Sequence, residues 1–303
     1  MPTSPPNVTT DHAEDAPAGS DEPVREVVVG VDGTECALSA VRWAALEAGR
    51  RSAPLRIVHA APYLGRREST GTPPPELPRA RGITAVAYTT ARHTAPGVRA
   101  ATEVVPADPT TTLLQAAAAG QLIVLGSSTT GAADELVLAP VALRVAARSP
   151  HPVVVVPRRR GTNSEGRSVV AVLGIGEGAD DEVVAAFAAA SAERSGNALT
   201  VLQTRPADRS APGSWVDAPE EWARRFPGLD VELQALPSPS ASQVLQATGA
   251  APLIVLSAGR GTLLHRTLDG PHRWLLRHST SPMALVPPVH RPQLDPGEDI
   301  PAL

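Results

Sequence analysis

The sequence predicts an α/β protein made of two tandem, doubly wound, Rossmann-like parallel sheets, each with five strands in the order 3-2-1-4-5. Short apolar runs alternate with helical segments, and runs without a polar alternate face are typical of strands buried on both sides. The whole pattern also occurs twice, since LIVL at residues 122–125 returns at residues 253–256, an offset of 253 − 122 = 131. Right-handed crossovers between such strands give the doubly wound arrangement.

The first copy supplies five strands and four helices. The predicted strands are residues 27–31, 55–59, 102–105, 122–125 and 153–156. The predicted helices are residues 35–51, 83–93, 110–118 and 136–148. Thr34 is a suitable N-cap for the first helix, and Ser149-Pro150 ends the last one. The proline-rich segment Arg66–Ala80 is predicted to be a loop.

The second copy follows the first with small shifts in alignment. Residues 27–32 (VVVGVD) align with residues 171–176 (AVLGIG), and residues 152–154 align with 282–284. The predicted organisation is a disordered tail at 1–24, a first domain at 25–158, a linker at 159–166, a second domain at 167–288 and a tail at 289–303. Both tails are rich in proline and acidic residues, which disfavours a packed core.

Composition and net charge argue against a nucleic-acid-binding or a membrane-spanning protein. The net charge of −4 does not indicate a nucleic-acid partner, and no apolar run reaches the ~18 residues of a membrane helix. The first 24 residues lack the apolar segment of a secretory signal, so we expect a cytoplasmic protein. The only cysteine, Cys36, excludes an internal disulfide. A small buried residue is favoured there, and a redox-active thiol at a helix start is the alternative.

Three stretches carry a family resemblance. They are VVVGVDGT at 27–34, LIVLGSS at 122–128 and VALRVAARSPHPVVVVP at 141–157. In this order and spacing they resemble the universal stress protein family, and the second copy resembles it more weakly. The resemblance implies dimers that pair through their last strands, so the two copies would form an intramolecular pseudo-dimer. It also implies ATP binding by an Asp after the first strand and a Gly-x-x-Gly-x₉-Gly-Ser/Thr loop.

In the first copy this nucleotide pattern is eroded. The candidate cofactor-binding residues are Asp32, Gly126, Ser127 and Ser128. The remaining family positions hold Thr129, Ala139 and Pro140 in place of Gly, Gly and Ser or Thr. Proline has no N–H, so a phosphate held there would lose a backbone hydrogen bond. ATP at the first domain therefore stays an alternative to a cleft without its family ligand.

The second copy departs further from the pattern. Gly176 aligns with the Asp, Ser257 with the first Gly and Arg260 with the second. The last pair is either Asp269-Gly270 or Gly270-Pro271. Arg260 could still contact an anion, but we expect no ATP here.

Several other residues have both a possible site role and a structural one. Residues 174–178 (GIGEG) lack the full dinucleotide-loop spacing and suit a flexible turn. His265, His272 and His278 are favoured as surface histidines over a metal site. His59 is either a pocket residue or a structural histidine. Arg158-Arg159-Arg160 is favoured as a solvated linker over a contact for an acidic partner or phosphate.

These patterns predict a binding module and not an enzyme, because no nucleophile, acid–base pair or metal set is indicated. We expect it to act through an unidentified protein partner or a small ligand. The alternative is an ATP-binding regulatory stress protein that uses the Asp32 and Gly126 cleft of the first domain.

Overall fold

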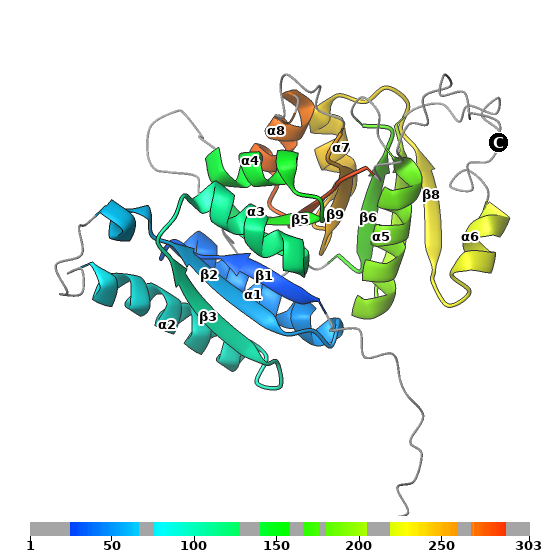
Figure 1. Cartoon of the computed structure of the whole chain (residues 1–303). Helices are drawn as coiled ribbons and strands as arrows, with labels where there is room; N and C mark the ends of the chain where they lie inside the picture. The colour runs from blue at the N-terminus through cyan, green and yellow to red at the C-terminus, as the bar shows by residue number, and fades with distance from the viewer. Residues whose placement is uncertain are drawn as a thin grey trace, which may run out of the picture.

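The computed structural model describes residues 25–66, 76–127, 140–157, 166–175, 180–204, 219–259, 268 and 270–288 (Figure 1). The predicted tails and residues 158–165, with the three arginines, lie outside these ranges. The first domain contains β1 (Glu26–Gly30), α1 (Glu35–Arg50), β2 (Leu55–Ala60), the 3-10 helix η1 (Pro62–Arg66), α2 (Leu77–Thr94), β3 (Ala100–Val105), α3 (Pro109–Ala119), β4 (Gly120–Ser127), α4 (Pro140–Arg148) and β5 (Val153–Pro157). The second contains β6 (Ser168–Leu173), α5 (Asp181–Ser195), β7 (Ala198–Gln203), α6 (Pro219–Arg225), β8 (Val231–Ala235), α7 (Ala241–Thr248), β9 (Ile254–Ser257), α8 (Gly270–His278) and β10 (Met283–Val286).

All ten strands belong to one sheet, in the order β3-β2-β1-β4-β5-β10-β9-β6-β7-β8. Each half therefore has the predicted order 3-2-1-4-5, and its own strands are all parallel. The two predicted five-stranded sheets are continuous, because β5 and β10 join the halves edge to edge through the last strands, as the family resemblance implies. This pairing gives each of the two inner edge strands a hydrogen-bonded neighbour inside the chain.

The junction between the halves has the symmetry of a dimer. In the antiparallel β5–β10 pair, Val154 lies opposite Ala284, Val155 opposite Met283 and Val153 opposite Leu285. The central pair consists of equivalent residues of the two copies, so a pseudo-two-fold axis passes beside it. The arrangement is that of an isologous dimer interface formed within one chain.

Helices cover both faces of the sheet. Residues of α1, α2, α5 and α6 share one core cluster with one face, and residues of α3, α4, α7 and α8 share another with the opposite face. Within a strand, neighbouring residues serve different clusters, as Leu122 and Ile123 do in β4. Burial on both sides explains why inner strands such as β1 and β5 have no polar alternate face, whereas the edge strands β3 and β8 carry exposed polar residues.

Helix α2 is longer than predicted. It begins at Leu77, within the segment that the sequence predicts to be a loop, and ends at Thr94. Proline at position 78 lies in the first turn, where its missing N–H has no partner to lose. Pro78, in the last part of this proline-rich segment, therefore belongs to the first turn of a helix and not to a loop. Residues 67–75 lie outside the described part.

A charged cluster joins α1 to α5 across the domain junction. The buried carboxylate of Glu47 lies 2.7 Å from Arg51 Nε, 3.6 Å from Arg50 Nη1 and 3.8 Å from Arg194 Nε of α5. The Arg51 guanidinium also lies 5.6 Å above the centre of the Phe187 ring, a cation–π contact to the same helix. One carboxylate thus bridges three guanidinium groups from both domains.

Candidate ligand cavity

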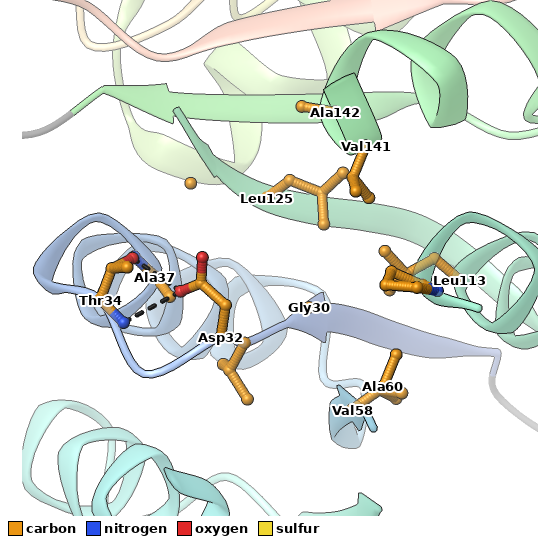
Figure 2. A pocket seen from close by; sticks show the side chains of 13 residues that line it. Gly30, Asp32, Thr34, Ala37, Val58, Ala60, Leu113, Leu125, Val141 and Ala142 are labelled. Atoms are coloured by element: carbon orange, nitrogen blue, oxygen red, sulfur yellow. Dashed lines mark hydrogen bonds between the residues drawn. The ribbon is translucent and has the colours of Figure 1, made fainter. Parts of the chain in front are cut away.

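A cavity of about 150 Å³ opens at the carboxyl ends of β1 and β4 (Figure 2). The helix that follows β1 packs on one face of the sheet, and the helix that follows β4 packs on the other. The cavity therefore lies at the topological switch point, where ligands of such folds bind. Six of the lining residues shape it: Gly30, Asp32, Leu113, Leu125, Val141 and Ala142. Only Asp32 among these six is polar, so the walls are largely apolar.

Gly30 keeps the cavity open. A Cβ at this position would lie 2.7 Å from Leu125 Cδ2 and 3.0 Å from Leu113 Cδ2. A larger side chain would therefore push into the space between β4 and α3. Neither Gly30 nor the α4 residue Ala142 was singled out from the sequence, because a small apolar residue carries no chemical signal of its own.

Asp32 lies at the rim, just after β1, as predicted. Its Oδ1 accepts hydrogen bonds from Thr34 N (2.9 Å) and Thr34 Oγ1 (2.7 Å). Thr34 in turn caps α1 as expected, accepting from Ala37 N at 3.2 Å. Figure 2 shows the second carboxylate oxygen pointing away from Thr34. That oxygen has no hydrogen-bond partner in the described part of the chain, so it is available to a donor group of a ligand.

Gly126 lines the cavity, but a packing contact accounts for it. A Cβ here would lie 2.6 Å from the carbonyl carbon and oxygen of Cys36 and 2.8 Å from Ala37 N. The start of α1 therefore approaches β4 so closely that only glycine fits. The survival of this family glycine is consequently no sign of a phosphate site. Cys36 itself is buried, which agrees with its favoured structural role.

The rest of the predicted loop is only partly described. Ser127 is buried in the last position of β4, where it pairs with Pro157 of β5. Ser128, Thr129 and Ala139 lie outside the described residues. Pro140 is the first residue of α4 and has no N–H, so this helix end offers one donor fewer to an anion.

Strand register corrects the alignment of the second copy. Val27 pairs with Leu55 in the first domain, whereas Val169 pairs with Leu199 in the second. The pairing on the other side of the strand gives the same alignment. Val28 pairs with Ile123 of β4, and Val170 pairs with Ile254 of β9, which is the equivalent of Ile123. The equivalent of Asp32 is therefore Gly174, two residues before the predicted Gly176. Residues 176–179 lie outside the described part, and Gly174 N donates to Asp181 Oδ1 at 2.9 Å.

Larger side chains occupy the corresponding cleft of the second domain. The positions of Gly30, Ala60, Gly126 and Ala142 hold Val172, Thr204, Ser257 and His272. All four replacements are buried. His272 is the third residue of α8, as Ala142 is of α4, and its Nε2 donates to the Ser257 carbonyl at 2.8 Å. The imidazole thus lies where the first domain has its cavity.

We expect His272→Ala to lower the free energy of unfolding by about 1–3 kcal/mol. The buried Ser257 carbonyl would lose its donor, and the shortened side chain would leave a void. Urea denaturation measures this change. The control is His278→Ala, on the exposed face of α8, which should stay within about 0.5 kcal/mol of wild type. Equal stability of the two variants would contradict a buried, hydrogen-bonded role for His272.

The other candidate residues take structural places or are not described. His59 is buried, with Nδ1 donating to Val31 O at 2.8 Å and Nε2 accepting from the Tyr63 hydroxyl at 3.2 Å, so it is a structural histidine. His278 stacks on Trp274, and the burial of His272 corrects its prediction as a surface residue. Arg260, His265 and Asp269 lie outside the described residues. Within the described ranges, no three His, Cys, Asp or Glu side chains are grouped as metal ligands.

Comparison with known proteins agrees with this architecture. The model of the universal stress protein family matches residues 23–157, which include β1, β4 and the whole cavity. The first domain is a universal stress protein domain. Universal stress proteins of Mycobacterium tuberculosis and Mycobacterium bovis are 25% identical to it over 287 residues, covering 86% of this chain and 96% of theirs.

Solved structures share the two-domain fold of this chain. One from Archaeoglobus fulgidus has a TM-score of 0.67 at 14% identity and covers 87% of this chain and 96% of its own. A putative universal stress protein of Pseudomonas aeruginosa has a TM-score of 0.58 at 15% identity, with coverages of 88% and 94%. At these identities the likeness concerns the fold alone. No helix in the described ranges is long and apolar enough to span a membrane.

Proposed function

We propose that this chain is a non-catalytic, cytoplasmic binding protein with one small-ligand site, in its first domain. The difference between the two clefts carries the proposal. The first domain keeps an open cavity beside Asp32, whereas His272 fills the equivalent space of the second. The second domain would then act as a structural partner that pairs through β10.

The cavity favours a compact ligand over a nucleoside triphosphate. Its volume of about 150 Å³ is below the roughly 300–1,000 Å³ of pockets for drug-sized ligands. Leu113, Leu125 and Val141 would contact a flat apolar body, and Asp32 would accept a hydrogen bond from it. Pro140 removes one N–H from the helix end that would hold a phosphate. We therefore propose a ligand about the size of a nucleobase or nucleoside.

ATP binding by the first domain remains the second candidate. The observation that favours it is the place of Asp32, at the end of β1 with one carboxylate oxygen available. In this function the chain would be an ATP-binding regulator, and the triphosphate would need donors other than the Pro140 amide.

The test is calorimetric titration of the full chain with adenosine and with ATP. We expect adenosine to bind at least as tightly as ATP. The variant Ala142→His, which copies the second domain, should weaken adenosine binding more than ten-fold because an imidazole would occupy the cavity. Asp32→Asn should also weaken it, because the amide offers a donor in place of an acceptor. The control is Arg148→Ala, at the exposed end of α4.

The possible results separate the candidates. Micromolar ATP binding that Asp32→Asn removes, with weaker adenosine binding, would support the ATP regulator instead. Binding that Ala142→His leaves unchanged, in a variant with the wild-type unfolding temperature, would locate the ligand elsewhere. Failure of both ligands at millimolar concentration would favour a protein partner.

A further inference from the structure

A second and larger cavity, of about 610 Å³, lies between the two domains. We call it the interdomain groove and define it by six of its lining residues: Arg42, Trp43, Leu46, Arg50, Pro252 and Pro282. The outer face of α1 forms one wall. The other comes from the turns that precede β9 and β10 of the second domain. The groove shares no lining residue with the β1–β4 cavity.

The walls of the groove present apolar surface. Trp43 is half-buried. Leu46, three residues or nearly one helical turn further along this face, is 45% exposed. Pro157, Pro252 and Pro282 add apolar rings. Because proline has no N–H, these three positions offer a ligand contact surface without backbone donors.

The charged groups of the groove are mainly cationic. Arg42 is exposed and has no hydrogen bond or ion pair with any described residue. Arg50 lies 3.6 Å from Glu47 Oε2, but the same carboxylate also neutralises Arg51 and Arg194. Its single negative charge cannot balance three guanidinium groups. The only acidic lining residue, Glu35, precedes Arg42 by two helical turns, or about 10 Å along the axis.

We propose that the interdomain groove binds a small organic anion with an aromatic or aliphatic body. The body would lie against Trp43, Leu46 and the proline rings, and the anionic group would pair with Arg42. A volume of about 610 Å³ falls within the roughly 300–1,000 Å³ of small-molecule pockets, which occur preferentially at domain interfaces. This site is independent of the ligand proposed for the first domain.

Both domains build the groove, so its ligand should also stabilise their pairing. A ligand that binds the folded, paired form and not the unfolded chain raises the free energy of unfolding by RT ln(1 + [L]/Kd), which increases with ligand concentration. Ligand binding in the groove would thereby be read out as a higher unfolding temperature of the whole chain.

The test uses the fluorescent anion 8-anilinonaphthalene-1-sulfonate with the full chain. We expect saturable binding at one equivalent with enhanced fluorescence, and a higher unfolding temperature. Arg42→Glu and Leu46→Asp should each weaken binding at least ten-fold, through the charge and the apolar wall respectively. The uncharged analogue N-phenyl-1-naphthylamine should bind at least ten-fold more weakly than the anion.

Two controls exclude other apolar surfaces. Tyr88→Asp on α2 and Trp274→Ala on α8 change exposed aromatic residues outside the groove and should leave binding unchanged. Since this dye also binds partly unfolded chains, near-ultraviolet circular dichroism must match wild type in each variant. The proposal would be overturned if the dye did not bind, or if binding were insensitive to both Arg42→Glu and Leu46→Asp. It would also be overturned if Trp274→Ala lost binding, or if the uncharged analogue bound equally well.

Discussion

Replacing Glu47 with glutamine should lower the free energy of unfolding by about 3–5 kcal/mol, because it removes the carboxylate that pairs with the buried guanidinium of Arg51 and with the partly exposed ones of Arg50 and Arg194. Arg51 is 91% buried at its side chain, and its Nη2 has no hydrogen-bond partner even with Glu47 present. Burial, followed by the neighbouring charge of Arg51, lowers the pKa of Arg194, and Glu47 opposes this effect. Without the carboxylate, three cations would face one another across the domain junction.

Equilibrium denaturation in urea measures this effect. The control is Glu221→Gln, which breaks the ion pairs of Glu221 with Arg224 and Arg225 on α6. Both arginines are well exposed, so we expect a change below about 1 kcal/mol. Adding Arg194→Gln to the Glu47→Gln variant should recover part of the lost stability, since one unpaired cation is removed. Similar losses in Glu47→Gln and Glu221→Gln would contradict a bridging role for Glu47.

The strands could be predicted from the sequence because parallel strands buried on both faces leave continuous apolar runs. Their order was predicted from the doubly wound arrangement that right-handed crossovers give. The union of two sheets into one could not be derived from those runs. An edge strand such as β5 carries the same valine-rich sequence whether its outer side is free or paired with β10. The family resemblance supplied that pairing, and its register of Val154 opposite Ala284 agrees with the internal symmetry.

Asp32, at the rim of the first-domain cavity, could be predicted from the sequence, whereas the apolar residues of the cavity walls could not. Asp32 carries a recognisable group at a recognisable place, after the first strand. The alignment of the second copy was wrong by two residues, because valine, alanine and leucine are interchangeable in strands without a polar face. The shared glycines of VVVGVD and AVLGIG then favoured the wrong register. That error concealed the replacement of Gly30 by Val172, which helps to fill the second cleft.

Replacing Gly126 with alanine should destabilise the protein by about 1–3 kcal/mol or more, even without ligand. The added Cβ would meet backbone atoms of Cys36 and Ala37 at 2.6–2.8 Å, and backbone atoms at a helix start cannot turn away as a side chain can. Relief would require moving α1 and, with it, the Thr34 cap that also orients Asp32. Ligand affinity should therefore fall together with stability.

The control for this substitution is Gly82→Ala, in the interior of α2. No atom lies within 4 Å of the Cβ that it would add, so alanine should raise the free energy of unfolding by about 0.5–1 kcal/mol through its higher helix propensity. Urea denaturation of both variants gives the comparison. A Gly126→Ala variant with wild-type stability that had lost only ligand binding would mean that this glycine serves the ligand and not the α1–β4 contact. The opposite signs expected at the two glycines follow from the space around each Cβ, which the residue type alone does not reveal.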